Sequence, residues 1–154
     1  MRALARLTCW VACTALLLAS CELNPLSPGV AVSREEKAIS LLVYSCPGER
    51  PLTVRVVQTD DESVGGTDDR ILWEVRSDVP PQLLVARYGE VPSGFVEVTT
   101  AAPLPPSQVA VVADWGDLQH ALLFRVDDVP QGALLADKGQ VSHMEFEDGA
   151  RAIC

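Results

Sequence analysis

The chain has two histidines, His120 and His143, and these are its only imidazole groups that could act as a general base near neutral pH. None of its serines lies in the Gly-x-Ser-x-Gly pattern that positions the nucleophile of α/β-hydrolases. His143 alternates with Val141 and Glu145 as residues on a strand do, and we interpret it as a structural histidine. We therefore predict no catalytic residue.

An acidic segment, Thr59–Asp69, places five carboxylates around Gly65-Gly66. Calcium prefers several carboxylate oxygens on a flexible loop, which makes a calcium site one interpretation of this segment. However, the segment lacks the spacing and the final glutamate of an EF-hand loop. A solvated turn between two strands is the interpretation we favour, and we predict neither a metal site nor a cofactor.

The first 20 residues have the composition of an export signal. Arg2 and Arg6 precede a run of apolar and small residues that extends from Leu7 to Ser20. This run is shorter than the roughly 20 apolar residues that a membrane-spanning helix needs. The pattern predicts a secretory signal peptide over residues 1–20.

The sequence Leu18-Ala19-Ser20-Cys21 at the end of this segment resembles the lipobox of bacterial lipoproteins. The resemblance implies cleavage between Ser20 and Cys21 and a diacylglycerol group on the Cys21 thiol, often with a further acyl chain on the new amino terminus. Two or three acyl chains are sufficient for stable anchoring. The protein is then expected in the cell envelope, on the outer side of the cytoplasmic membrane or in an outer membrane. The alternative is an ordinary secretory signal followed by an incidental cysteine.

The five cysteines divide into three groups on this interpretation. Cys9 and Cys13 belong to the leader and Cys21 carries the lipid, which leaves Cys46 and Cys154. Two cysteines in an oxidising compartment are expected to form a disulfide. A redox or metal-binding pair is the alternative, but neither cysteine belongs to a Cys-x-x-Cys motif.

The charge of the chain bears on its partners. The full sequence has a formal net charge of −9. Because the leader contains two of the 12 basic residues and none of the 21 acidic ones, the remaining chain carries about −11. Its basic residues are scattered singly, so we expect no nucleic-acid partner.

Two prolines, a serine and a glycine follow Cys21 closely, and we expect a flexible tether over residues 21–37. From residue 38 to 154, short β-rich runs alternate with turn residues, which predicts one all-β domain. The expected fold is a small antiparallel β-sandwich, or a partly open barrel, of about 7–9 strands closed by one disulfide. The runs are Ala38–Ser45, Leu52–Gln58, Arg70–Arg76, Gln82–Tyr88, Gly94–Thr99, Gln108–Asp114, His120–Val126 and Gln140–Phe146.

Aromatic residues indicate a core and a candidate surface. Trp73 lies on an apolar strand face and is predicted to be buried, whereas Tyr88 and Trp115 lie near turns and are candidates for a binding surface. The segments Ile71–Val75 and Tyr88–Phe95 together resemble a pattern of uncharacterised secreted actinobacterial proteins. That resemblance implies no particular activity.

Three functions remain open at this point. The first is a lipid-anchored, non-catalytic binding or structural module with an envelope or extracellular protein partner. The second is an inhibitor or immunity-type lipoprotein whose acidic surface covers a basic partner. The third, which we favour least, is an envelope hydrolase that uses His120 or His143 beside a carboxylate.

Overall fold

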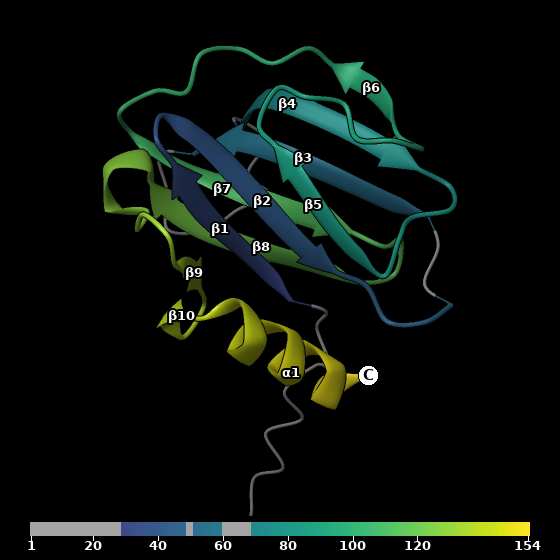
Figure 1. Ribbon diagram of the computed structural model, residues 1–154. Helices are drawn as coiled ribbons and strands as arrows, with labels where there is room; N and C mark the ends of the chain where they lie inside the picture. Colours follow the sequence, from purple (N-terminus) through teal and green to yellow (C-terminus); the bar gives the residue numbers. More distant parts are fainter. Residues whose placement is uncertain (1–28, 49–50, 60–68) are drawn as a thin grey trace, which may run out of the picture.

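The computed structural model describes residues 29–48, 51–59 and 69–154 (Figure 1). Two antiparallel sheets of five strands each enclose a common core, and one helix lies beside them. The prediction of an all-β antiparallel sandwich is confirmed, and the described residues form ten strands where we expected about 7–9.

The first sheet, sheet A, has the strand order β10-β9-β1-β2-β5, and the second, sheet B, has the order β6-β4-β3-β7-β8. Each strand of sheet A is antiparallel to its neighbours, and so is each strand of sheet B. The strands of sheet A are β1 (Val30–Glu35), β2 (Ala38–Tyr44), β5 (Leu83–Arg87), β9 (Leu134–Ala136) and β10 (Gly139–Val141). Those of sheet B are β3 (Leu52–Gln58), β4 (Arg70–Ser77), β6 (Val96–Thr99), β7 (Gln108–Asp114) and β8 (Gln119–Arg125). A short 3₁₀ helix, Val126–Asp128, follows β8, and the helix α1 covers His143–Ile153.

The core between the sheets follows from the period-two alternation of the strands. In β3, for example, Leu52, Val54 and Val56 face inward and are at most 1% exposed. Trp73 of β4 is fully buried in this core, as predicted from the sequence. Each large apolar side chain buried in this way contributes about 1.5–3 kcal/mol to folding.

A second apolar cluster covers the opposite face of sheet A. Leu42 and Tyr44 of β2 pack there with Ala31 and Leu134, and the residues that cover them are Phe146 and Ala150 of α1. The strand β2 therefore has apolar residues on both faces because sheet B covers one face and α1 covers the other.

The boundary that we expected between tether and domain, at residues 37 and 38, is wrong. Residues 30–35 form β1, which pairs with β2 from Val30↔Val43 to Glu35↔Ala38. Its first four residues are buried. Because α1 and sheet B cover its two faces, both sets of alternating side chains are apolar or small, and the strand shows no apolar–polar alternation. The domain therefore includes residues placed in the tether, while residues 21–28 lie outside the described part of the chain.

The strand expected over Gln140–Phe146 is also wrong in its second half. Strand β10 ends at Val141, and α1 begins at His143. The hydroxyl of Ser142 accepts a hydrogen bond from the backbone N–H of Glu145, and the Glu145 carboxylate accepts one from the backbone N–H of Ser142. This capping box satisfies N–H groups that the first turn of a helix leaves free, so it fixes the start of α1.

The predicted disulfide is confirmed. Cys46, two residues after β2, is bonded to Cys154, which directly follows α1, and their Cα atoms are 5.3 Å apart. The bond closes a loop between residues 108 positions apart in the sequence. It ties the end of α1 to sheet A, where Phe146 and Ala150 of the same helix are already buried.

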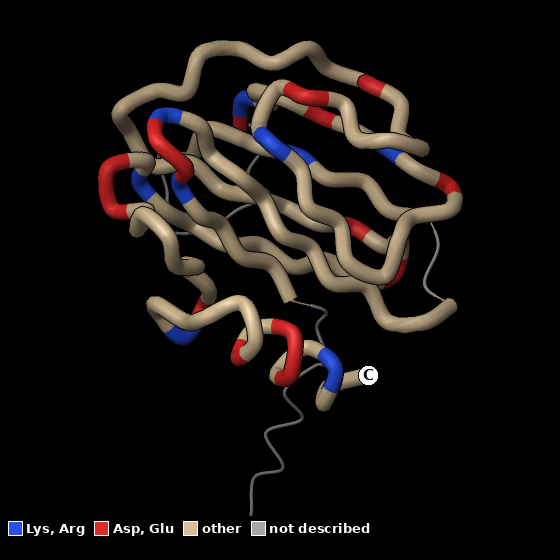
Figure 2. Tube along the Cα trace, viewed as in Figure 1, with Lys and Arg blue, Asp and Glu red and all other residues tan. Residues whose placement is uncertain are grey.

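Charged residues lie at turns, on several strands and on α1 (Figure 2). Lys and Arg occur singly among the described residues, as they do along the sequence. Acidic residues occur in several turns and on the helix, where Glu145, Glu147 and Asp148 outnumber Arg151.

Candidate functional site

Tyr88, a candidate for the binding surface, is largely engaged inside the domain. Its hydroxyl donates a hydrogen bond of 2.5 Å to the carbonyl oxygen of Ala102, and its ring meets that of Trp73 edge-on at 5.6 Å. Burial raises the pKa of the Tyr88 hydroxyl, and the hydrogen bond to Ala102 partly offsets the increase. Tyr88 therefore anchors the chain after β6 to the core, but its side chain is only partly buried, and its assignment to a binding surface stays a prediction.

Trp115, the other candidate, is only 6% exposed. Its indole N–H donates a hydrogen bond of 2.8 Å to the hydroxyl of Ser45, which is itself buried. The contact joins the turn after β7 in sheet B to the end of β2 in sheet A. Trp115 is thus a core residue that links the two sheets, and its assignment to a binding surface is wrong.

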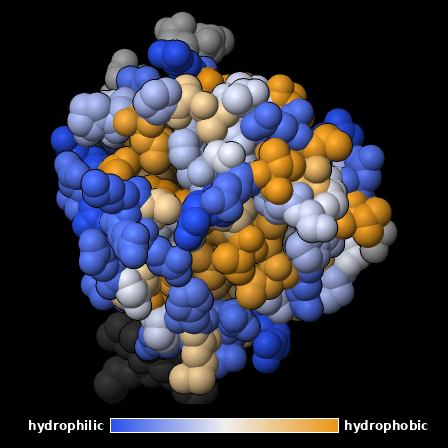
Figure 3. Space-filling view, turned by 45° about the horizontal axis from the view of Figure 1, so that its top comes forward, coloured by the Kyte–Doolittle hydropathy of each residue, from blue (hydrophilic) through white to orange (hydrophobic). Residues whose placement is uncertain are grey.

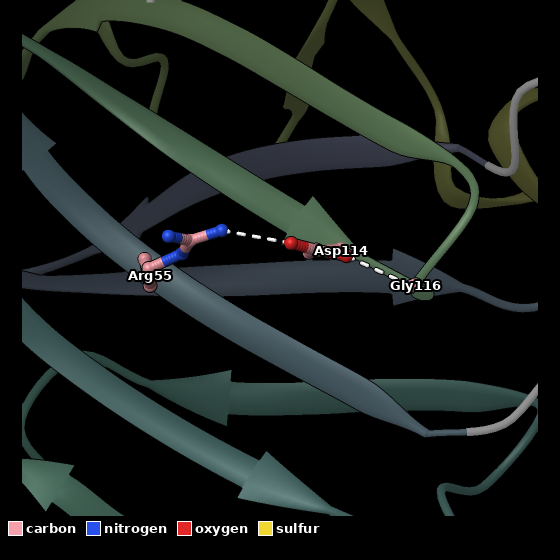
Figure 4. A network of polar contacts seen from close by, with 3 residues as sticks. All are labelled: Arg55, Asp114 and Gly116. Atoms are coloured by element: carbon pink, nitrogen blue, oxygen red, sulfur yellow. Dashed lines mark hydrogen bonds and ion pairs between the residues drawn. The ribbon is translucent and has the colours of Figure 1, made fainter. Parts of the chain in front are cut away.

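Polar contacts hold the turn that carries Trp115 (Figure 4). Arg55 of β3 donates a hydrogen bond of 2.9 Å to one carboxylate oxygen of Asp114, and the backbone N–H of Gly116 donates one of 2.8 Å to the other. Gly116 has a φ of 91°, a conformation that side chains disfavour. Because both carboxylate oxygens of Asp114 are used in this way, we interpret the network as a support for the turn.

The two histidines lie in different surroundings. His143 is the first residue of α1 and is exposed. His120 of β8 is 15% exposed, and its Nε2 atom is 2.8 Å from a carboxylate oxygen of Asp137 in the turn between β9 and β10. The oxygen lies out of line with the ring N–H direction, so this close contact is not a well-formed hydrogen bond.

His120 and Asp137 line a half-open cavity of about 450 Å³ beside α1, which we call the α1 groove. Most of its lining is apolar or small, and the polar groups are few. The lining consists of Gly29, Val30, His120, Ala136, Asp137, Lys138, Val141, Glu145, Phe146, Gly149, Ala150, Ala152 and Ile153.

The groove is hollow because the helix presents small residues to it. Gly149, Ala150 and Ala152 come from one turn of α1, and a Cβ atom placed on Gly149 would meet nothing within 4 Å. At Gly29 the opposite holds, since a Cβ atom there would lie 2.8 Å from the ring of Phe146. The absence of a side chain at Gly29 lets α1 approach the start of β1 closely, while that at Gly149 leaves open space.

The capping box positions one side of the groove. The backbone and side-chain hydrogen bonds from Ser142 lower the pKa of Glu145. Glu145 therefore remains a carboxylate at neutral pH and keeps the start of α1 fixed beside the groove. Because its pKa is lowered by folding, its contribution to stability is present above the ordinary pKa of a glutamate and is lost in more acidic solution.

A cavity of this size with an apolar lining and few polar groups has the composition of a small-molecule site. Its described lining contains no hydroxyl or thiol side chain. Among the residues that the structure describes, no three His, Cys, Asp or Glu side chains form a group that could hold a metal ion. Most of the acidic segment, residues 60–68, lies outside the described residues, as do Ser20 and Cys21.

Sequence reasoning singled out His120 but missed the rest of the groove. The capping box was readable as Ser142-x-x-Glu145, and it would have placed a helix where we expected a strand. No pattern indicated that this helix would lie beside β1.

No model of a known protein family matches the chain, and no curated protein or solved structure matches it either. The described residues include no helix of the length and apolar composition needed to cross a membrane.

Proposed function

We propose that the protein is a lipid-anchored, non-catalytic binding module of the bacterial cell envelope, and that it holds a small apolar molecule in the α1 groove. The observation that carries this proposal is the groove itself, an apolar cavity of about 450 Å³ built from four separate parts of the chain. The lipobox-like sequence Leu18–Cys21 supports the anchoring.

The position of the groove fits an anchored binding module. Gly29, at its edge, follows Cys21 by eight residues, so covalent geometry limits the distance between them to about 30 Å. A lipid group on Cys21 would keep the groove within reach of apolar molecules that partition into a membrane.

The composition of the groove supports binding rather than hydrolysis. A hydrolase that uses a covalent intermediate needs a nucleophile beside its base. Beside His120 the described lining offers carboxylates and an amine but neither a hydroxyl nor a thiol. His120 also lies against Asp137, and in a binding module this pair ties β8 to the turn between β9 and β10.

Filling the groove should weaken ligand binding without harming the fold. The Gly149→Leu side chain would enter the open space next to the Gly149 Cα atom, and leucine favours a helix over glycine by about 0.5–1 kcal/mol. We expect the affinity of the full chain for N-phenylnaphthylamine, a neutral apolar dye, to fall about tenfold while stability rises slightly. A fluorescence titration measures the affinity, and thermal unfolding measures the stability.

The matched control is Met144→Leu, because Met144 lies on the same helix, is 72% exposed and does not line the groove. This variant should bind the dye as the parent chain does. Equal dye binding by the Gly149→Leu variant would exclude the groove as the ligand site.

The anchor is tested separately. Cys21→Ala removes the thiol that would carry the diacylglycerol group, so we expect the protein to move from the membrane fraction to the soluble fraction. Cys9→Ala is the control, because this cysteine lies in the predicted leader and should not affect anchoring. Fractionation with immunodetection measures the result, and an exported Cys21→Ala variant that stays fully membrane-bound would contradict the lipid anchor.

A further inference from the structure

A second hollow lies at the edge of sheet B that β6 forms. It shares no lining residue with the α1 groove. It has a volume of about 730 Å³, and its lining includes Val79, Val96, Val98, Arg76 and Asp78. We call it the β6 hollow. The view in Figure 3 brings forward the end of the molecule that carries β6 and shows apolar side chains interspersed with hydrophilic ones.

The valines of this hollow are unusually exposed. Val79, Val96 and Val98 are 64%, 63% and 55% exposed, and they are three of the eight large apolar side chains that are exposed in the described chain. Val96 pairs with Arg76 of β4, so both point to the outer face of sheet B, away from the core. Apolar side chains gathered at one exposed site indicate an interaction surface.

The β6 strand is also the edge of its sheet. It pairs with β4 on one side, and its other side has no strand partner among the described residues. An edge strand presents unpaired backbone N–H and C=O groups, and native proteins protect such edges with lysine or proline, inward-pointing charges, β-bulges or short strands. The four residues of β6, Val96–Thr99, include no lysine or proline, although the strand is short and its register with β4 shifts between Glu74 and Val75. The backbone of this edge can pair with one further short extended segment.

The charge of β6 indicates which charge the added partner strand should carry. Glu97 lies between the two valines, is exposed, and receives only a hydrogen bond of 3.1 Å from the hydroxyl of Thr100. Like charges directly opposite each other on paired strands are destabilising, whereas a basic residue opposite Glu97 would be favourable. Antiparallel self-pairing of β6 centred on Glu97 would bring two copies of this carboxylate together, which disfavours that pairing with a second copy of this chain.

We propose that β6 is a strand-addition site for an extended segment of a basic protein partner. The backbone of the segment pairs with Val96–Thr99. Its apolar side chains enter the β6 hollow beside Val96 and Val98, and a lysine or arginine on its opposite face lies across from Glu97. The proposal does not depend on a ligand in the α1 groove. It gives a structural basis to the inhibitor or immunity-type function, in which an acidic lipoprotein covers a basic partner.

The test uses the full chain, purified as the cell processes it, and a short synthetic peptide that alternates valine and lysine. We expect saturable binding by fluorescence anisotropy, with slower hydrogen exchange of the Val96–Thr99 amides. A peptide with glutamate in place of lysine should bind about tenfold more weakly. Glu97→Lys should reverse this preference.

Matched variants locate the site. Val96→Thr with Val98→Thr keeps β-branched residues on the strand but removes apolar contacts, and it should weaken peptide binding about tenfold. Val85→Thr is the control, because Val85 is a 60% exposed valine on β5, an edge strand of sheet A. No peptide binding, equal binding of both peptides or an unchanged affinity in the double variant would overturn the proposal. A dimer in sedimentation that the double variant abolishes would also overturn it, because the occupant would then be a second copy.

Discussion

Replacing both Cys46 and Cys154 with serine should lower the free energy of unfolding by about 4–5 kcal/mol. The chain-entropy treatment of cross-links gives this magnitude for a closed loop of roughly 100 residues, and the loop here spans 108 positions. Cys154 is exposed, so its sulfur contributes little packing. Most of the loss of stability should therefore come from the greater conformational entropy of the unfolded chain without the cross-link. Urea unfolding measured by circular dichroism determines the change.

The same variant should loosen α1. Phe146 and Ala150 are the buried residues of this helix, and the disulfide holds its last turn. Hydrogen exchange of the α1 amides should therefore accelerate more than that of β3 or β7. The single variants serve as controls, because either one alone breaks the bond and should cost about as much as the two together. A loss below about 1 kcal/mol would contradict this role of the disulfide.

Trp115→Ala should lower the free energy of unfolding by about 3–5 kcal/mol, the range for a large aromatic side chain removed from a core. Two effects combine in this variant. The indole leaves a cavity between the sheets, and the buried hydroxyl of Ser45 loses its 2.8 Å hydrogen bond. Denaturant unfolding gives the magnitude, with the slope checked for two-state behaviour.

Trp115→Phe separates the two effects. It keeps most of the buried apolar area but removes the indole N–H, so the expected loss is only about 1–3 kcal/mol. If Trp115→Ala instead left stability unchanged and weakened the binding of a partner, the original assignment of Trp115 to a binding surface would be restored.

Among the strands that the sequence predicted well, β3 shows simple alternation, whereas β7 is buried on both faces from Val109 to Ala113. The limits of β3 and β7 agree with the expected runs Leu52–Gln58 and Gln108–Asp114. In β3, Leu52, Val54 and Val56 face the core, while Thr53 and Arg55 are partly exposed on the other face. Local sequence is sufficient for such strands because the two faces differ in polarity.

The two errors have different causes, one a neighbour distant in the sequence and the other a local signal. Strand β1 lacks alternation because α1 covers its outer face, and no local pattern reports that contact. The alternation of Val141, His143 and Glu145 predicts a strand, but the capping box formed by Ser142 and Glu145 starts α1 there instead.

The candidate site was harder to predict than the fold. Tyr88 and Trp115 lie next to glycines in turns, which suggested exposure, but both side chains point back into the domain. The α1 groove depends on small residues that leave space, such as Gly149, and empty space has no local sequence pattern. The disulfide, in contrast, was predictable from the sequence, because the expectation depends on the number of cysteines and on an oxidising compartment rather than on the shape of the fold.

The bond between Cys46 and Cys154 also turns most of the domain into a covalent ring. A protease that cuts one peptide bond between these two cysteines opens the ring but releases no fragment. Both resulting pieces stay joined through the disulfide, and they remain attached to the segment that precedes Cys46. The chain can therefore be cut once in any turn between β3 and α1, and every part of the domain still remains attached to the segment that precedes Cys46.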